Sequence, residues 1–253
     1  MIDDNLGGAL MQIEVLPIAG LHFLPYLEDK LVIVIDVLRA TSTMVTALAN
    51  GCQAIVPVLT PEEAIEKRLT IPSSLLGGER NAVMIEGFDL GNSPFDYVPE
   101  KVGGKRVIMT TTNGTRAIRS AVKAPIVWMC SFLNMQSIVL AAMRQLEKNS
   151  QLQGIVVFCA GTEDRFDIPD TLCAGMFIDA LGYNVELNDL GEVARLLYQC
   201  SENELENKIR SSVHGRKLIS LGFEQDVVYC STPNILPIIP ALENGEIVWF
   251  SEQ

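Results

Sequence analysis

The chain has 253 residues, of which 48% are hydrophobic and 20% are charged, a balance typical of folded globular proteins rather than disordered ones. Its formal net charge is -12, so its surface repels phosphate backbones and anionic lipids. We therefore expect neither nucleic acid nor a membrane as a partner. No apolar run approaches the roughly 18–20 residues that a membrane helix needs.

The N-terminal sequence MIDDNLGGAL is acidic and lacks a basic region followed by an apolar core. We expect residues 1–10 to form a loose leader and not a signal peptide. The chain contains 6 cysteines, widely spaced and without a C-x-x-C pair, which indicates reduced thiols instead of disulfides or a zinc site. These features predict a cytoplasmic protein.

Strand-like and helix-like patterns alternate along the chain. Apolar runs predict strands at residues 12–17, 31–37, 53–58, 106–112, 126–130, 154–160 and 246–250. Helical periodicity predicts helices at residues 42–50, 61–69, 115–123, 133–148, 170–182, 189–199 and 203–221. Strands that are apolar on every residue, separated by helices, are typical of a parallel sheet covered on both faces. The predicted fold class is therefore α/β, a three-layer α/β/α sandwich around a largely parallel sheet with mixed edges.

Two segments do not fit the alternation. Residues 71–104 are rich in Gly, Pro and Asn with weak periodicity, which predicts a long loop that belongs to a functional site. The chain from about residue 225 is rich in proline and strand-like, which suggests an edge hairpin or an oligomer contact. We expect one domain over residues 1–253, with two intimately packed lobes as the alternative, and a homo-oligomer, most simply a dimer.

Three predicted strands end in polar sequence directly before a helix. The segments are LVIVIDVLRATST (31–43), RVIMTTTNGTR (106–116) and VVFCAGTEDRFDIPD (156–170). Ligands of open α/β sheets bind outside the carboxyl ends of the strands, and helix N-termini and arginine both attract anions. One such junction alone is an ordinary helix cap, but three together favour an anion pocket. The candidate anion-binding residues are Arg39, Thr41, Ser42, Asn113, Gly114, Thr115, Arg116 and Arg165.

The segment GGER adds a glycine pair, Glu79 and a further candidate, Arg80. Carboxylates beside an anion site indicate a bridging cation, and Mg²⁺ takes hard oxygen ligands. Asp36 and Glu79 are the first candidates for metal ligands, with Asp89 and Asp170 after them. Asp89 could equally be a turn residue in FDLGNSP.

The two histidines differ in their surroundings. His22 lies among aromatic and aliphatic residues and is expected to be structural. His214, in SSVHGRKL, is a candidate general acid, with a hydrogen-bonding role at a helix end as the alternative. Cys173 lacks the arginine spacing of a cysteine phosphatase loop, so we expect it to pack in the core. The P-loop and dinucleotide-binding signatures are both missing from the sequence.

Taken together, these blocks resemble the 2-phosphosulfolactate phosphatase family, Mg²⁺-dependent enzymes known from coenzyme M biosynthesis. The resemblance implies a three-layer α/β fold and hydrolysis of the phosphate ester of 3-sulfolactate to 3-sulfolactate and phosphate. The matching blocks are DVLRATST (36–43), GGER (77–80), GFDLGNSP (87–94), TTTNGT (110–115), SVHG (212–215) and DVVYC (226–230).

The expected chemistry is in-line phosphoryl transfer, which relies on positioning and charge stabilisation. Asp36 and Glu79 would hold Mg²⁺, while Arg39 and Arg116 would hold the phosphoryl oxygens. The attacking group could be a metal-activated water or a carboxylate such as Asp36.

Arg80 and Arg165 would bind the carboxylate and the sulfonate of the substrate. The alternatives are a phosphatase or phosphotransferase for another phosphorylated 2-hydroxy acid, and a non-enzymatic protein that binds phosphorylated anions. In every case the expected partner is a small phosphorylated hydroxy acid.

Overall fold

The computed structural model describes residues 11–18, 26–182 and 184–250, so the expectations for residues 1–10 and His22 lie outside the described residues. The strands are β1 (Met11–Leu16), β2 (Leu31–Ile35), β3 (Ala54–Pro57), β4 (Leu75–Arg80), β5 (Val83–Met84), β6 (Arg106–Thr110), β7 (Ile126–Cys130), β8 (Ile155–Cys159), β9 (Val185–Leu187), β10 (Pro240–Glu243) and β11 (Glu246–Trp249). The helices are α1 (Ala40–Ala49), α2 (Pro61–Thr70), α3 (Pro99–Val102), α4 (Gly114–Ser120), α5 (Met135–Lys148), α6 (Ile168–Leu181), α7 (Asp189–Gln199), α8 (Leu205–Ser211), α9 (Val213–Ser220) and α10 (Glu224–Cys230).

The strands form an 11-stranded sheet in the order β5-β4-β6-β3-β11-β10-β7-β2-β8-β1-β9. It consists of two parallel blocks, β4-β6-β3 and β7-β2-β8-β1-β9. The antiparallel hairpin of β10 and β11 joins them, through the single pairs Ala241–Trp128 and Ile247–Ile55. The short strand β5 adds an antiparallel edge beside β4. The predicted α/β class and the largely parallel sheet with a mixed edge are therefore confirmed.

Alternate residues of β2 face opposite sides of the sheet. Leu31, Ile33 and Ile35 belong to a hydrophobic cluster that includes residues of α5 and α6. Val32 and Val34 belong to a second cluster that includes residues of α1 and α4. All five side chains are buried, because helices cover both faces and leave no solvent-facing position in the strand. This arrangement gives the three predicted layers.

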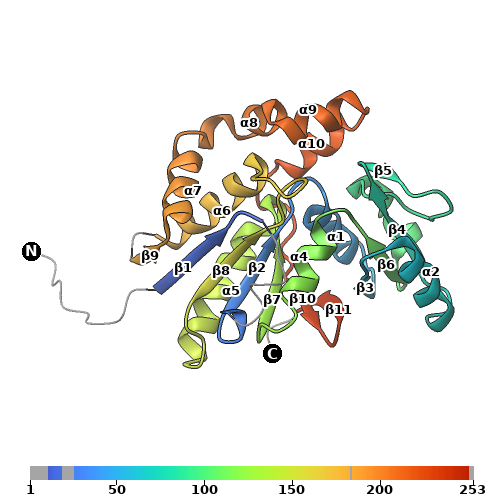
Figure 1. The fold of residues 1–253 in the computed structure, drawn as a ribbon, viewed down its shortest axis with the longest axis horizontal. Helices are drawn as coiled ribbons and strands as arrows, with labels where there is room; N and C mark the ends of the chain where they lie inside the picture. The colour runs from blue at the N-terminus through green and yellow to red at the C-terminus, as the bar shows by residue number, and fades with distance from the viewer. Residues whose placement is uncertain (1–10, 19–25, 183, 251–253) are drawn as a thin grey trace, which may run out of the picture.

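The C-terminal third differs from the expectation. The segment DVVYC, which was expected to be strand-like, lies within helix α10, and the single helix predicted at 203–221 is two helices that meet at Ser212. The predicted edge hairpin is present, but it lies in the middle of the sheet. Helices α8, α9 and α10 lie beyond the carboxyl ends of β1 and β2 (Figure 1). They are thus placed to cover the strand ends.

The predicted long loop at 71–104 is also more ordered than expected. Strand β4 runs through its GGER segment and pairs in parallel with β6. A Cβ on Gly78 would lie 1.9 Å from the carbonyl oxygen of Thr110, so only glycine allows this close approach. Within residues 11–18, 26–182 and 184–250, no helix is both long enough and apolar enough to cross a membrane.

Candidate active site

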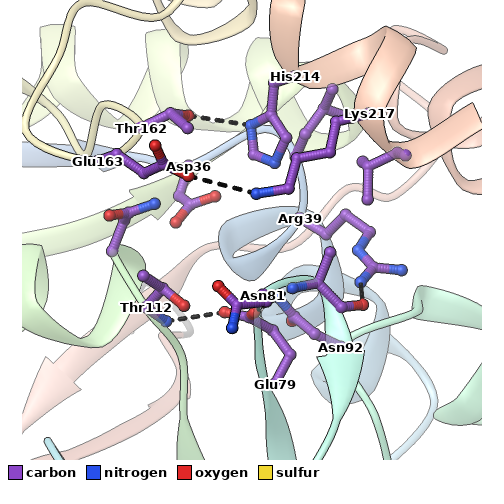
Figure 2. A pocket seen from close by; sticks show the side chains of 14 residues that line it. Asp36, Arg39, Glu79, Asn81, Asn92, Thr112, Thr162, Glu163, His214 and Lys217 are labelled. Carbon is purple, nitrogen blue, oxygen red and sulfur yellow. Dashed lines mark hydrogen bonds and ion pairs between the residues drawn. The ribbon is translucent and has the colours of Figure 1, made fainter. Parts of the chain in front are cut away.

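A pocket of about 520 Å³, open to solvent, lies where the segments that follow β2, β6 and β8 meet β4 and α9. Figure 2 shows 14 residues around it. The segments are far apart in the sequence, so the pocket forms only when the sheet is assembled. The lining residues are Asp36, Leu38, Arg39, Glu79, Asn81, Ala82, Asn92, Thr112, Asn113, Thr162, Glu163, His214, Lys217 and Leu218.

Asp36 directly follows strand β2, and the residue is 7% exposed. Its Oδ1 accepts a hydrogen bond from the backbone N–H of Ala40 at 3.2 Å, at the start of α1. Burial raises the pKa of Asp36 to about 6, His214 opposes the shift, and Glu79 adds to it. A carboxyl group with a pKa this close to neutral is typical of functional sites.

Glu79 approaches the pocket from strand β4. Its Oε1 accepts a hydrogen bond from the N–H of Thr112 at 2.8 Å, and its Oε2 accepts one from the N–H of Ala82 at 2.7 Å. These two bonds fix the carboxylate while each oxygen keeps a further lone pair. Glu79 and Asp36 therefore supply two buried carboxylates to the same pocket.

Arg39 lines the pocket, but its guanidinium group is held by protein atoms. Nη1 donates to Oδ2 of Asp226 at 2.6 Å, and Nη2 donates to the carbonyl of Ala82 at 2.6 Å. The side chain also lies 4.2 Å from the ring centre of Phe223. Ser93 donates to the other oxygen of Asp226 at 2.8 Å. Arg39 thus fixes α10 against the start of α1, a role that the sequence analysis did not predict.

His214 lies near the start of α9, whose N-cap is Ser212. Its Nδ1 is 3.0 Å from Oγ1 of Thr162 and 3.3 Å from Oδ2 of Asp167. Both contacts engage the same ring nitrogen, so Nε2 is available to the pocket; Figure 2 shows the ring's other nitrogen directed there. The geometry is that of a histidine oriented by a carboxylate, as in general acid–base sites.

Asp170 was predicted as a metal ligand, and the structure places it outside the pocket lining. Its Oδ1 accepts from the N–H of Val37 at 2.9 Å, and its Oδ2 accepts from the N–H of Gly161 at 3.1 Å. The residue is 1% exposed and does not line the pocket. It connects the segments that follow the neighbouring strands β2 and β8, and so positions them.

Asp89, the other secondary metal candidate, is also outside the pocket. Its Oδ2 accepts from the N–H of Leu76 at 2.8 Å and lies 3.1 Å from Arg68. These contacts agree with the alternative interpretation of Asp89 as a turn residue. Within the described residues, no group of three or more His, Cys, Asp or Glu side chains could hold a metal ion.

Several predicted anion-binding residues serve the protein's own structure. The hydroxyl groups of Thr41, Ser42 and Thr115 donate to the backbone carbonyls of Asp36, Val37 and Thr111. All three side chains are buried, and none lines the pocket. These hydroxyl groups therefore bond the backbone at the start of each helix. They are not N-caps, because Arg39 and Asn113 occupy the N-cap positions of α1 and α4.

Three of the predicted arginines also lie away from the pocket lining. Arg80 lies next to Glu79 in β4 and donates to the carbonyl of Leu59 and to Oγ1 of Thr110. Adjacent residues of a strand point to opposite faces, so the two cannot both enter the pocket. Arg116 pairs with Asp164, and Arg165 is exposed. The structure therefore does not bring these three side chains into the pocket lining.

Asn113 and Gly114 stand where α4 begins. Asn113 is the N-cap residue and lines the pocket. A Cβ on Gly114 would lie 2.7 Å from Oδ2 of Asp36 and 2.4 Å from Cβ of Ala40. The missing side chain lets the start of α4 touch the carboxylate at the end of β2.

Several lining residues were not among the predicted site residues, and three of them are Lys217, Asn81 and Asn92. Lys217 lies one helical turn after His214 in α9 and pairs with Glu163 at 3.3 Å. Asn81 lies beside Glu79 and has a positive φ of 56°. Asn92 is 5% exposed, and its Oδ1 has no hydrogen-bond partner among the described residues. An unpaired buried amide oxygen at a pocket wall is a natural place for a cation or a water.

Comparison with known proteins gives a consistent family. The sequence profile described as 2-phosphosulpholactate phosphatase matches residues 22–245. The probable 2-phosphosulfolactate phosphatase of Symbiobacterium thermophilum is 41% identical, over 88% of this chain and 95% of that protein. Proteins with the same description are 44% identical in Caldanaerobacter subterraneus (87% and 90% covered) and 42% identical in Thermotoga maritima (87% and 92% covered). The chain therefore belongs to the 2-phosphosulfolactate phosphatase family, whose named activity is the hydrolysis of a phosphoric monoester.

Proposed function

We propose that the protein hydrolyses 2-phospho-3-sulfolactate to 3-sulfolactate and inorganic phosphate, with Mg²⁺ as its cofactor. The substrate is the one named for its relatives. The observation that carries the proposal is that two buried carboxylates, Asp36 and Glu79, share a pocket with the oriented imidazole of His214. A phosphatase needs both charge neutralisation and a proton donor in one place, and this pocket offers candidates for each.

The lining residues fit Mg²⁺ by their chemistry. Mg²⁺ prefers oxygen ligands and is usually held by one or two carboxylates together with water and phosphate oxygens. Asp36 and Glu79 would be those carboxylates, and Oδ1 of Asn92 is an unpaired oxygen in the same pocket wall. When bound, the ion would supply positive charge to the phosphoryl oxygens.

The protein's own groups account for the remaining steps. The N–H of Ala40 orients the carboxylate of Asp36 for in-line approach to phosphorus, either as the attacking group or as the group that positions a water. Asp167 and Thr162 hold His214 so that Nε2 can donate a proton to the leaving alkoxide. The hydrogen bonds from Thr112 and Ala82 keep Glu79 in place throughout.

The proposal is tested by incubating the purified protein with Mg²⁺ and 2-phospho-3-sulfolactate and measuring inorganic phosphate and 3-sulfolactate. We expect both products in equal amounts. Conversion of the ester without release of phosphate would favour a phosphotransferase. If the ester binds but remains intact, and chelation of Mg²⁺ does not change the binding, the result would favour a non-enzymatic protein that binds phosphorylated anions.

A further inference from the structure

The pocket has two cationic lining residues within the described parts of the chain, Arg39 and Lys217. The two side chains differ in how easily they can move to contact a ligand. Arg39 is 3% exposed, and its guanidinium group is fixed by Asp226 and the carbonyl of Ala82. It cannot turn to a ligand without breaking a buried ion pair. Lys217 is the cation that remains adjustable.

Lys217 forms an ion pair whose partner, Glu163, a ligand can replace. Nζ of Lys217 lies 3.3 Å from Oε1 of Glu163, and the side chains are 40% and 66% exposed. Exposed pairs of this type contribute little, because water screens both charges. An anionic ligand that enters the pocket can therefore replace Glu163 as the partner of the ammonium group. Figure 2 shows Lys217 directed into the pocket below His214.

The order of groups on the substrate matches the order of groups on α9. His214 and Lys217 lie one turn apart on the same helix face, with His214 close enough to affect the pKa of Asp36. In 2-phospho-3-sulfolactate the phosphate ester and the carboxylate share C2, whereas the sulfonate is on C3. The sulfonate therefore lies one carbon further from the reacting phosphorus than the carboxylate does, and Lys217 is the lining residue one turn beyond His214 on α9.

We propose that Lys217 is the specificity-determining residue that binds the sulfonate of the substrate, and that Glu163 holds the ammonium group in place until substrate replaces it. The inference rests on the proposed function. Lys217 was not among the residues predicted from the sequence. It takes the sulfonate-binding role that was expected of Arg80 and Arg165, which lie away from the pocket lining.

The test compares two esters, 2-phospho-3-sulfolactate and 2-phospholactate, which lacks the sulfonate. Lys217→Ala should raise KM for the sulfonated ester by about tenfold or more, as expected for loss of a charge-assisted hydrogen bond. Its KM for 2-phospholactate should stay near the wild-type value. Lys217→Arg should restore most of the affinity, and Glu163→Gln should lower KM for the sulfonated ester. Lys208→Ala, an exposed lysine of α8, is the matched control.

A binding measurement separates this inference from the proposed function. Calorimetry should show that 3-sulfolactate binds the wild type more tightly than Lys217→Ala by a similar factor, and that lactate does not distinguish them. If this holds but no phosphate is released from the ester, the hydrolase proposal fails and the sulfonate assignment stands. If phosphate is released but Lys217→Ala changes KM for both esters equally, the assignment is wrong. If 3-sulfolactate binds the wild type no more tightly than lactate does, the assignment is wrong, whether or not phosphate is released from the ester.

Discussion

Gly114 and Asp36 lie in contact although they follow strands from different parallel blocks of the sheet. A Cβ on Gly114 would lie 2.7 Å from Oδ2 of Asp36 and 2.4 Å from Cβ of Ala40. The start of α4 therefore forms one wall of the space around the carboxylate. The position of Asp36 depends on a residue that has no side chain.

Gly114→Ala should disturb this contact. Overpacking of this kind costs about 1–3 kcal/mol, and we expect a comparable loss in the free energy of unfolding. The turnover rate should fall by more than the loss of stability explains, because Asp36 or the start of α4 must move to make room for the new methyl group. Urea unfolding and steady-state kinetics on the same preparation check both parts. A variant with wild-type activity would show that the contact does not matter for the site.

The stability of the metal-free protein should depend on pH through Asp36. Burial raises its pKa from an ordinary value of 3.8 to about 6, so the folded state binds the proton more tightly than the unfolded chain. The resulting stabilisation is fully present below about pH 4 and is lost as the pH rises through about 6. Relative to Asp36→Asn in EDTA, the wild type should lose up to roughly 3 kcal/mol between about pH 4 and pH 7. A difference that does not change with pH would contradict the shift.

The Arg39–Asp226 ion pair should contribute far more to the free energy of unfolding than the exposed ion pairs do. Its side chains are 2% and 4% exposed, and its atoms are 2.6 Å apart. Removing one partner of a buried pair costs about 3–5 kcal/mol, because the other charge stays buried and unpaired. Asp226→Asn should show a loss of this order in chemical denaturation.

Glu206→Gln is the matched control for this pair. Glu206 lies 3.7 Å from Arg210, and the side chains are 49% and 31% exposed. Exposed pairs are worth about 0–1 kcal/mol, so this variant should be nearly as stable as the wild type. Equal effects of the two substitutions would contradict the positioning role of Arg39.

Asp170 should affect stability without affecting the number of bound metal ions. Its two oxygens accept N–H groups from Val37 and Gly161, and an asparagine can offer only one carbonyl oxygen in their place. We expect Asp170→Asn to lose about 1–3 kcal/mol of stability, the cost of an unsatisfied buried group. Calorimetric titration with Mg²⁺ should give the wild-type stoichiometry. A lost metal site would instead restore the ligand role predicted from the sequence.

Local sequence pattern predicted the fold class and part of the pocket. Asp36 and Asn113 stand at the ends of buried strands, and such positions can be located from the apolar run that precedes them. His214 and Glu79 were recognised from short motifs and also line the pocket. Their chemical roles stay predictions.

The errors come from long-range contacts. The strand character of β4 depends on pairing with β6, where Gly78 packs against the backbone of Thr110. Without that strand, nothing in the sequence says that Glu79 and Arg80 point to opposite sides. In the sequence, Lys217 has the pattern of an ordinary solvent-exposed helix residue. It reaches the pocket only because α9 lies over the strand ends. Thr41 likewise has the residue type of a ligand, but its hydroxyl group donates to the backbone carbonyl of Asp36.

The central claim is that carboxylates at the strand ends hold Mg²⁺ for phosphate ester hydrolysis. Its most direct test is release of inorganic phosphate from 2-phospho-3-sulfolactate by the wild type and by Asp36→Asn, each with Mg²⁺ and with excess EDTA. We expect rapid release only by the wild type with Mg²⁺, and recovery when Mg²⁺ is restored after EDTA. Release that persists in EDTA, or wild-type turnover by Asp36→Asn, would contradict it.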